Sequence, residues 1–390
     1  MNVLNDIQSE LASLRAAGTY KQAPVIEGHM GAMVRLADGR EVVNLCSNNY
    51  LGLADHPAVV NGAMEALHRH GSGTASVRFI CGTFSIHQEL EGLIADFFGM
   101  ERSTTYVSCW NANEALVPTL LGEGDVVISD ALNHASIIDA CRLAGKGVIR
   151  LIYRHGDMDD LAAQLAAARS ARRKLIITDG VFSMEGDLAN LPAIVELARA
   201  HGALVAVDDS HAHGVVGKTG RGTPEHFGVP VDIITGTLGK ALGGAAGGFI
   251  AGPAAVIELM VQRSRPQLFS NALPPAVAGG AIAALRLLML EPQRVAALGD
   301  NVQYFRTKLA ELGYHALQSP SAIVPVIVGQ TAKAIALARA MLEHDVLITG
   351  FGYPVVPEGA ARLRAQISAA HGREHLDRAL EAFAALKSSL

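Results

Sequence analysis

Short, nearly continuous apolar runs alternate with amphipathic segments through the middle of the chain. Strands that are covered by helices on both faces have such runs, which are typical of a parallel sheet. The runs that fit this pattern best are 126–129, 175–178, 204–207 and 233–235. Residues 161–168 and 194–201 have the spacing of crossover helices between these strands. We therefore expect an α/β protein with a large, mostly parallel α/β/α sheet domain.

The two ends of the chain show a different pattern, with short strands and long helices. Residues 5–17 have apolar positions at helical spacing, and 33–36 and 42–45 predict two short strands. After about residue 285, Ala- and Leu-rich helical stretches flank a strand-like run at 323–327. The pattern predicts an N-terminal helix with small strands (1–45), the large sheet domain (46–285) and a C-terminal α+β domain (286–390).

Composition narrows the classes of function. Half of the 390 residues are hydrophobic, only 18% are charged, and the net charge is −5. Nucleic-acid binding generally needs a basic face, so we do not expect it here. The four cysteines form no CxxC pair and no metal spacing, and the first residues lack the pattern of a signal peptide. We expect a cytoplasmic protein with reduced thiols and no bound metal.

Two uncharged stretches have nearly the length of membrane spans. Residues 241–257 and 267–285 contain no charged side chain, but glycines interrupt the first, and prolines and glycines interrupt the second. Buried segments of a dense core are the better interpretation, so we expect no membrane association.

The strongest chemical signal is a lysine in a glycine-rich loop. Residues 235–244 place Lys240 among small and apolar residues, directly after a predicted strand. Such surroundings bury a lysine, and burial favours the neutral amine, which is a better nucleophile and base. Thirty-two residues before the lysine, another predicted strand ends at Asp208, and His211 follows three residues later.

These three side chains meet the needs of a pyridoxal 5′-phosphate site. The lysine can hold the cofactor as a Schiff base, the aspartate can keep its ring nitrogen protonated, and the histidine can bond its phenolic oxygen. Asp209 and His213 lie close enough in sequence to take the roles of Asp208 and His211. The residues alone leave both assignments open.

Several groups could hold the phosphate of such a cofactor. Residues 109–113 follow a strand-like run and open a helix, and the backbone amides at a helix N-terminus bind phosphate. Thr237 offers a hydroxyl to the same group, and Ser270 could do so from a neighbouring subunit. Capping or turn formation is the ordinary alternative for each of these residues.

Other polar residues could contact the ring or the substrate. His134 follows the predicted strand at 126–129 and could stack on the ring, although a lone histidine is more often a satisfied core residue. Ser183 could bond the phenolic oxygen or only form a turn. Arg362 and Arg364 fall on one face of a predicted strand, and either guanidinium could clamp an α-carboxylate. Spacing alone does not choose between them.

Eight stretches of the chain carry a family resemblance. They are 48–53 (NNYLGL), 78–83 (RFICGT), 129–139 (SDALNHASIID), 178–184 (TDGVFSM), the loop around Lys240, 263–266 (RSRP), 268–271 (LFSN) and 350–357 (GFGYPVVP). By these motifs the sequence resembles the α-oxoamine synthases, a family of fold-type I pyridoxal-phosphate enzymes, from Leu4 to Leu386. The resemblance implies the fold of that class: a large α/β/α sheet domain and a smaller α+β domain.

The resemblance also implies a role for each candidate. Lys240 would be the Schiff-base lysine and Asp208 the partner of the ring nitrogen. The other implied assignments are His211 and Ser183 for the phenolic oxygen, His134 for stacking on the ring, the amides of Cys109 and Trp110 together with Thr237 and Ser270 of the partner subunit for the phosphate, and Asn48 and Arg364 for the amino-acid carboxylate.

The implied activity is acyl transfer between an acyl-CoA and an amino acid. The motifs are most similar to those of members that join glycine and acetyl-CoA, or that cleave 2-amino-3-ketobutyrate with CoA. The first alternative is a synthase that takes another amino acid or a longer acyl-CoA and then decarboxylates its product. A fold-type I aminotransferase or lyase is a more distant alternative. The resemblance further implies a homodimer with the active site at its interface.

Four positions depart from the residues that the resemblance leads us to expect. Trp110 replaces a common phenylalanine, Asn111 replaces an aspartate, and Phe84 and Ile86 stand in a stretch that is more polar in the glycine-specific members. The bulkier apolar groups could reshape the acyl or amino-acid pocket. Ordinary drift in a loop is the alternative.

Overall fold

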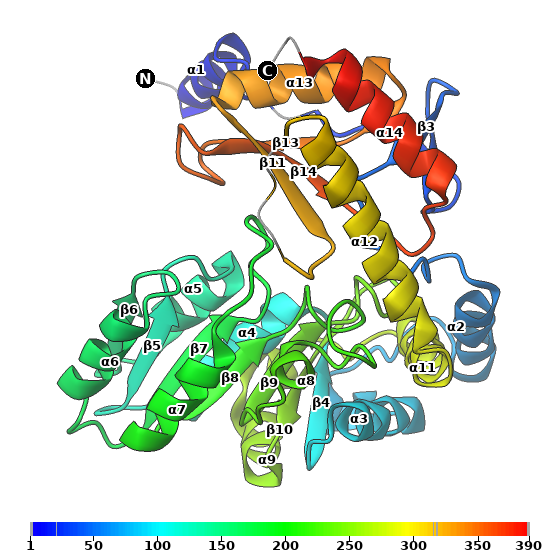
Figure 1. Ribbon diagram of the computed structural model, residues 1–390. Coiled ribbons are helices and arrows are strands. Elements are labelled where there is room, and N and C mark those ends of the chain that lie inside the picture. Colours follow the sequence, from blue (N-terminus) through cyan, green and yellow to red (C-terminus); the bar gives the residue numbers. More distant parts are fainter. Residues whose placement is uncertain (1–2, 21, 315, 317–318, 388–390) are drawn as a thin grey trace. The chain divides into compact units, whose positions relative to one another are not determined.

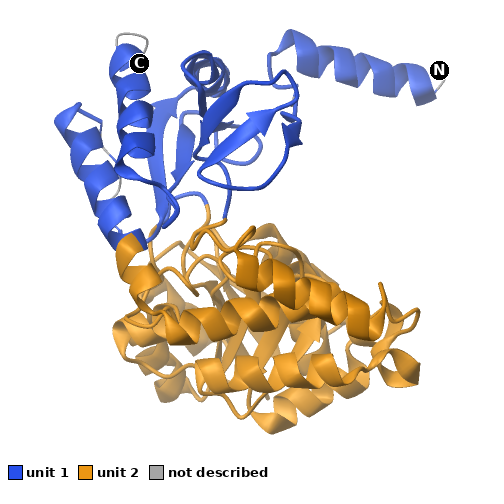
Figure 2. Ribbon diagram, turned by 90° about the vertical axis from the view of Figure 1, so that its right-hand side faces the viewer, with its two compact units in different colours: residues 1–48, 184–186, 298–390 blue, residues 49–183, 187–297 orange. Residues whose placement is uncertain are grey.

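The computed structural model describes residues 3–20, 22–314, 316 and 319–387. The chain forms two compact units. Unit 1 comprises residues 1–48, 184–186 and 298–390, and unit 2 comprises 49–183 and 187–297 (Figure 2). The domain boundaries expected after residues 45 and 285 stay a prediction beside these units.

A seven-stranded sheet forms the centre of unit 2 (Figure 1). Its strand order is β4-β10-β9-β8-β7-β5-β6, and only β10 runs antiparallel to its neighbours. The strands are β4 (Arg102–Tyr106), β5 (Val126–Asp130), β6 (Ile149–Tyr153), β7 (Lys174–Asp179), β8 (Leu204–Asp208), β9 (Ile233–Thr237) and β10 (Gly248–Gly252). The mostly parallel sheet expected from the apolar runs is therefore confirmed.

Helices cover the sheet on both faces and extend beyond one edge. In sequence order they are α2 (Pro57–His70), α3 (Ser85–Phe98), α4 (Cys109–Leu120), α5 (Ala135–Leu143), α6 (Met158–Ala167), α7 (Leu191–His201), α8 (Thr223–Phe227), α9 (Ala254–Arg263), α10 (Arg265–Phe269) and α11 (Pro275–Leu290), with a π-helical turn, η1, at Arg78–Gly82. Helices α4, α5 and α9 share one apolar core with the strands, to which Leu116, Ile137 and Ile257 contribute. Helices α6 and α7 pack on each other and on other strands of the sheet.

Local sequence signals explain where these helices begin and end. Helix α7 starts after Asn190, whose side chain accepts a hydrogen bond from the amide of Ala193, and it ends at Gly202 in the left-handed region (φ 63°). Helices α2 and α11 approach each other closely because Gly62 and Gly279 face one another. A Cβ on Gly279 would lie 2.4 Å from the carbonyl oxygen of Gly62, so only glycine fits there.

Unit 1 contains two small sheets. Strands β1 (Ile26–Glu27), β2 (Met33–Leu36), β3 (Glu41–Asn44) and β12 (Val346–Leu347) form one sheet, and β11 (Ile323–Gly329), β14 (Ala361–Gln366) and β13 (Thr349–Phe351) form the other. Its helices are α1 (Val3–Ala16), α13 (Thr331–Glu343), α14 (Arg373–Ala385) and most of α12 (Gln293–Glu311).

The expected elements all occur, but one detail differs from expectation. No side chain of α1 is buried, although its apolar positions predicted a packed face. The stretch 241–257 contains the buried strand β10, between β4 and β9, and the start of α9, and 267–285 contains most of α11, which is largely buried. Among the described residues no single helix is long and apolar enough to cross a membrane, whereas α11 and α12 together, bent by 82°, meet that test by length and composition only.

Candidate active site

Six strands of unit 2 end at the same edge of the sheet, and a cavity lies at this edge. Strands β4, β5, β6, β7, β8 and β9 run in one direction, and open α/β sheets bind ligands outside the carboxyl ends of such strands. The carboxyl-edge cavity has a volume of about 210 Å³. Seven predicted site residues line it: Cys109, Trp110, His134, Asp208, His211, Thr237 and Lys240.

Asp208 is held at the end of β8 by donors on both carboxylate oxygens. Asn113 Nδ2 donates to Oδ2 at 2.6 Å, and the amide of Ser210 donates to Oδ1 at 2.9 Å. The thiol of Cys109 also donates to Oδ2, at 3.6 Å. Asp208 is buried but lines the carboxyl-edge cavity, so its carboxylate is fixed in one direction towards a ligand.

The rival residues of this segment lie elsewhere. Asp209 accepts hydrogen bonds from the amide and hydroxyl of Thr223, at 2.8 and 2.6 Å, and burial raises its pKa to about 7. His213 is fully buried, its Nε2 lies 2.7 Å from the carbonyl oxygen of Thr237, and burial lowers its pKa to about 4. Neither side chain lines the carboxyl-edge cavity, whereas Asp208 and His211 do.

His211 is oriented by a residue that the sequence reasoning missed. The hydroxyl of Tyr50 lies 2.7 Å from Nδ1 of His211, and the tyrosine ring is fully buried. A hydrogen bond to Nδ1 fixes the ring orientation and leaves Nε2 to face a ligand. The only sequence signal was the position of Tyr50 inside the motif at 48–53.

The turn after β9 presents Lys240 and Thr237 to the carboxyl-edge cavity. The Thr237 hydroxyl accepts a hydrogen bond from the amide of Gly239 at 3.0 Å and donates to the carbonyl of Gly247 at 3.3 Å. These bonds, with His213 on the Thr237 carbonyl, fix the backbone three residues before Lys240. Lys240 therefore lines the carboxyl-edge cavity beyond the end of a strand, and it is half-buried, whereas its loop predicted burial.

The first turn of α4 forms another wall of this cavity. Ser108 caps the helix, because its Oγ accepts the amide of Asn111 at 3.2 Å. Cys109 and Trp110, the first residues of the helix, both line the carboxyl-edge cavity, and the amides of a helix's first turn have no partner within the helix. The positive end of the helix dipole adds to them, so this corner suits a phosphate group.

His134 lies across this cavity from the turn and caps α5. Its Nδ1 lies 2.8 Å from the Ser136 hydroxyl, and its backbone amide donates to Oδ2 of Asp179 at 2.9 Å. Desolvation lowers the pKa of His134, so the ring is neutral at pH 7. The Trp110 ring meets it edge-on, with centroids 5.9 Å apart at 81°. A flat, neutral imidazole there can stack on an aromatic ligand.

A buried asparagine connects these parts and was missed from the sequence. Asn113 Nδ2 reaches both Asp208 and the Ser136 hydroxyl (2.9 Å), and its Oδ1 accepts the hydroxyl of Thr235 at 2.8 Å. The residue is fully buried on α4. It joins the ends of β8 and β9 to α5, and no spacing rule marks such a residue in advance.

Four predicted residues do not line the carboxyl-edge cavity. Ser183 lies in the hairpin after β7 and Ser270 directly follows α10, both in unit 2. Asn48 and Arg364 belong to unit 1, so their roles stay predictions. Within unit 1, Arg362 bonds Oε1 of Glu185 at 2.8 Å and the carbonyl of Met184 at 3.0 Å. These contacts engage Arg362 within unit 1, and the carboxylate role of Arg364 stays a prediction.

The groups around the carboxyl-edge cavity fit pyridoxal 5′-phosphate. An amine (Lys240), a fixed carboxylate (Asp208) and two open helix amides with the Thr237 hydroxyl provide the partners for an aldehyde, a pyridine nitrogen and a phosphate. Among the described residues no cluster of three or more His, Cys, Asp or Glu side chains could hold a metal ion.

Comparisons with known proteins agree with this geometry. The family described as aminotransferase class I and II matches residues 40–383. The chain is 47% identical to 2-amino-3-ketobutyrate coenzyme A ligase of Escherichia coli over 388 residues, covering 98% of this chain and 97% of that protein. It is 46% identical to 8-amino-7-oxononanoate synthase of Symbiobacterium thermophilum over 387 residues, covering 98% of both.

Solved structures agree on the fold. Serine palmitoyltransferase of Sphingomonas wittichii aligns with a TM-score of 0.93 at 32% identity, covering 100% of this chain and 99% of that one. A variant of the enzyme from S. paucimobilis, solved with bound PLP, aligns equally well at 30% identity over the same shares of the two chains. The predicted fold-type I architecture and its cofactor are confirmed.

Proposed function

The chain belongs to the aminotransferase class I and II family and to the α-oxoamine synthases within it, and we propose that it joins glycine and acetyl-CoA, or cleaves 2-amino-3-ketobutyrate with CoA. One observation carries the proposal: Lys240, Asp208, His211 and the open end of α4 line a single cavity. The amino acid and the acyl group are inferred from the relatives, one of which, the human mitochondrial ligase, is 48% identical over 97% of this chain.

Each predicted site residue then has a task. When bound, pyridoxal phosphate supplies an electron sink for a carbanion at the α-carbon of an amino acid. Lys240 would hold the aldehyde carbon of the cofactor, and its free amine would take the α-proton of the amino acid. Asp208 keeps a proton on the ring nitrogen, and the two donors on its carboxylate hold it in place for that bond. His211 and Ser183 bond the phenolic oxygen, and His134 stacks on the ring.

Two further groups hold charged ends in place. The amides of Cys109 and Trp110, the hydroxyl of Thr237 and Ser270 of the partner subunit bind the phosphate. Arg364 and Asn48 of unit 1 bind the substrate carboxylate. Arg364 lies on β14, where its guanidinium stacks on Phe351 at 4.5 Å, and stacking restricts the directions in which it can bond a carboxylate.

A second candidate function has direct support from the comparisons. The 8-amino-7-oxononanoate synthase relative matches almost as well as the ligases, so overall identity does not decide the substrates. The departures at Phe84 and Ile86 lie away from the carboxyl-edge cavity within one chain: Phe84 packs against His70 and His87, and Ile86 is buried. The similarity to the synthase leaves an enzyme that accepts a longer acyl-CoA as the alternative function.

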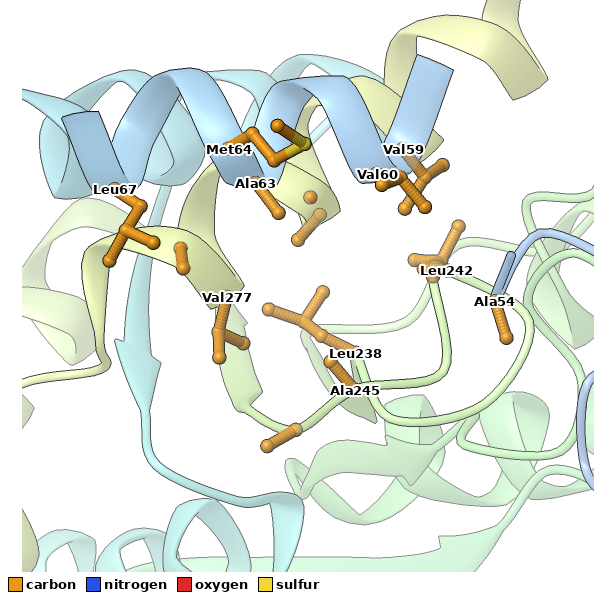
Figure 3. Close-up of a pocket in the computed structure, with 15 residues that line it drawn as sticks. Ala54, Val59, Val60, Ala63, Met64, Leu67, Leu238, Leu242, Ala245 and Val277 are labelled. Atoms are coloured by element: carbon orange, nitrogen blue, oxygen red, sulfur yellow. The ribbon is translucent and has the colours of Figure 1, made fainter. Parts of the chain in front are cut away.

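A homodimer completes the proposal. Helices α2 and α11 and the loop after β9 surround an apolar cavity of about 260 Å³, where Met64, Leu238 and Val277 face the same space (Figure 3). On α2 the side chains of Val60, Met64 and Leu67 are 40%, 50% and 43% exposed. Contiguous exposed apolar surface of this kind marks an interaction site. We assign this α2–α11 cavity to contact with a second copy of the chain.

Exchange of the α-proton tests the amino-acid half of the proposal. The holoenzyme is incubated in D₂O with glycine, alanine or serine, and loss of the α-proton signal is followed by NMR. Glycine should exchange fastest, because it is the amino acid that we infer from the ligase relatives. Exchange with alanine but not glycine would contradict this choice and favour the synthase alternative. No exchange with any of them would contradict the proposed chemistry of Lys240.

A further inference from the structure

His155 lies between two carboxylates behind the carboxyl-edge cavity. It follows β6, and its Nδ1 is 3.0 Å from Oδ1 of Asp130 while its Nε2 is 2.9 Å from Oδ2 of Asp187. The ring also meets Phe182 edge-on, with centroids 4.4 Å apart. His155 is not among the residues that line the carboxyl-edge cavity, so any effect on a ligand must pass through its neighbours.

The histidine is charged in this position. Hydrogen bonds to Asp130 and Asp187 raise the pKa of His155 to about 10, against the opposing effect of its burial. At neutral pH both ring nitrogens therefore carry a proton, and each donates to one carboxylate. The imidazolium therefore lies between two carboxylates, with Asp130 at Nδ1 and Asp187 at Nε2.

Asp130, one of the two carboxylates that bind His155, also binds the loop that leads to His134. Asp130 ends β5, its Oδ1 accepts the amide of Leu132 at 2.8 Å, and its Oδ2 accepts the amide of Gly156 at 3.2 Å. The loop continues through Asn133 to His134, the residue predicted to stack on the cofactor. Asp130 thus holds the start of this loop, and Asp179 holds its end through the amide of His134.

The other carboxylate lies at the base of the hairpin that carries Ser183. The amide of Phe182 donates to the carbonyl of Asp187 at 3.0 Å, and Val181 pairs with Leu188 in an antiparallel bridge. Ser183 directly follows Phe182, whose ring contacts His155. His155 therefore touches both sides of the hairpin base, one through Asp187 and one through the Phe182 ring.

We propose that His155 is a positioning residue that joins the loop presenting His134 to the hairpin carrying Ser183, and so sets both against the cofactor. The proposal rests on the proposed function, in which these two residues contact the ring. Without the imidazolium, Asp130 and Asp187 face each other as like charges, and the hairpin moves away from the loop.

The test compares two variants of the full-length holoenzyme. His155→Gln removes the charge and one donor, and Arg172→Gln breaks an ion pair to Asp125, whose side chain is fully buried just before β5, at the opposite end of that strand. Loss of a hydrogen bond to a charged group should weaken pyridoxal-phosphate binding about tenfold in His155→Gln and shift the absorbance of the bound cofactor. Arg172→Gln should leave both readouts unchanged.

Two further variants separate positioning from general loss of structure. His155→Lys keeps a cation between the carboxylates and should restore part of the affinity. If His155 acts through the hairpin, the His155→Gln loss should be smaller in a Ser183→Ala background, because linked residues are not additive.

Three results would overturn the proposal. They are unchanged binding and absorbance in His155→Gln, an equal loss in Arg172→Gln, and full additivity with Ser183→Ala. An unmodified chain that binds no pyridoxal phosphate would instead refute the proposed function, and this proposal would fall with it.

Discussion

Neighbouring residues after β8 have opposite surroundings, and this decides which of them can act on a ligand. Asp208 turns towards the carboxyl-edge cavity with donors on both oxygens, whereas Asp209 turns into the protein towards Thr223. His211 and His213 divide in the same way. The chemistry of this segment therefore depends on side-chain direction more than on residue type.

This difference predicts a contrast between two matched variants. Asp208→Asn should retain the fold but lower turnover about 100-fold or more, because electrostatic partners of a reacting centre contribute on that scale. Asp209→Asn should keep most of the turnover and lower the unfolding free energy by about 1–3 kcal/mol, because it weakens buried bonds to Thr223. Steady-state kinetics and urea unfolding measure both. Equal kinetic losses would show that the structural assignment of Asp208 is wrong.

The sequence indicated the candidates with a distinctive local setting. Lys240 was marked by its glycine-rich loop, whereas the residues alone left Asp208 and Asp209 as rivals, and the structure shows that only Asp208 lines the cavity. Tyr50 and Asn113 could not be found in this way, because their partners lie 161 and 95 residues away in the chain. Hydrogen bonds between residues so far apart in the chain depend on tertiary packing, which a local sequence pattern does not show.

At the scale of elements, the start of α4 is fixed by its contact with β10. A Cβ on Gly248 would lie 2.2 Å from the amide nitrogen of Cys109, so the strand and the helix touch through backbone only. This contact places the amides that we assign to the phosphate.

Gly248→Ala should therefore displace the first turn of α4. We expect weaker pyridoxal-phosphate binding and a loss of about 1–3 kcal/mol in unfolding free energy from overpacking. Gly92→Ala on α3 is the matched control, because a Cβ there meets nothing within 4 Å and a helical Gly→Ala change stabilises. Unchanged cofactor affinity in Gly248→Ala would argue against phosphate binding by α4.

The turn before Lys240 gives the protein a stability that depends on pH. Because burial lowers the pKa of His213 to about 4, the unfolded chain takes up a proton more readily than the folded one. The contribution of the neutral His213 ring to the unfolding free energy is complete above pH 6.5 and is lost as the pH falls towards 4. At pH 5 it amounts to about 2 kcal/mol of lost unfolding free energy.

His213→Gln should remove this part of the pH dependence. Glutamine can still donate to the Thr237 carbonyl but does not titrate. Urea unfolding at pH 7 and pH 5 measures the difference, which should be smaller in the variant by about 2 kcal/mol. His371 in unit 1 also has a pKa lowered to about 4, so some pH dependence should remain. An identical pH dependence in both proteins would show that His213 does not titrate as described.

Elements with a clear hydrophobic pattern could be predicted from the sequence, whereas elements in uncharged stretches could not. The central strands β5, β7, β8 and β9 followed directly from their apolar runs. Strand β10 and helix α11 were hidden in stretches without charges, where a buried strand and a buried helix look alike. The exposed face of α1 shows the converse, since a helical pattern does not tell what the helix packs against.

At the scale of the whole molecule, the homodimer is the assignment with the widest consequences. If the α2–α11 cavity binds a second copy, Met64→Glu should place a charge in an apolar contact and release monomers, which light scattering after gel filtration detects. The monomer should also bind pyridoxal phosphate more weakly, because Ser270 of the partner subunit is then missing. Ile152→Glu, at a still more exposed apolar position on β6, is the control and should stay dimeric.

A wild-type protein that is monomeric at micromolar concentration would contradict the dimer directly. A Met64→Glu variant that stays dimeric would place the interface elsewhere on the chain. Neither result would alter the description of the carboxyl-edge cavity, because all the residues that line it belong to one chain.

The central claim is that this chain transfers an acyl group between CoA and an amino acid, and release of the CoA thiol measures it most directly. The holoenzyme is mixed with acetyl-CoA with and without glycine, beside the Lys240→Ala variant. The account predicts thiol release that needs both substrates and that Lys240→Ala abolishes. Release that needs an amino acid other than glycine, or octanoyl-CoA in place of acetyl-CoA, would favour the synthase alternative. No amino-acid-dependent release with any thioester would contradict the account.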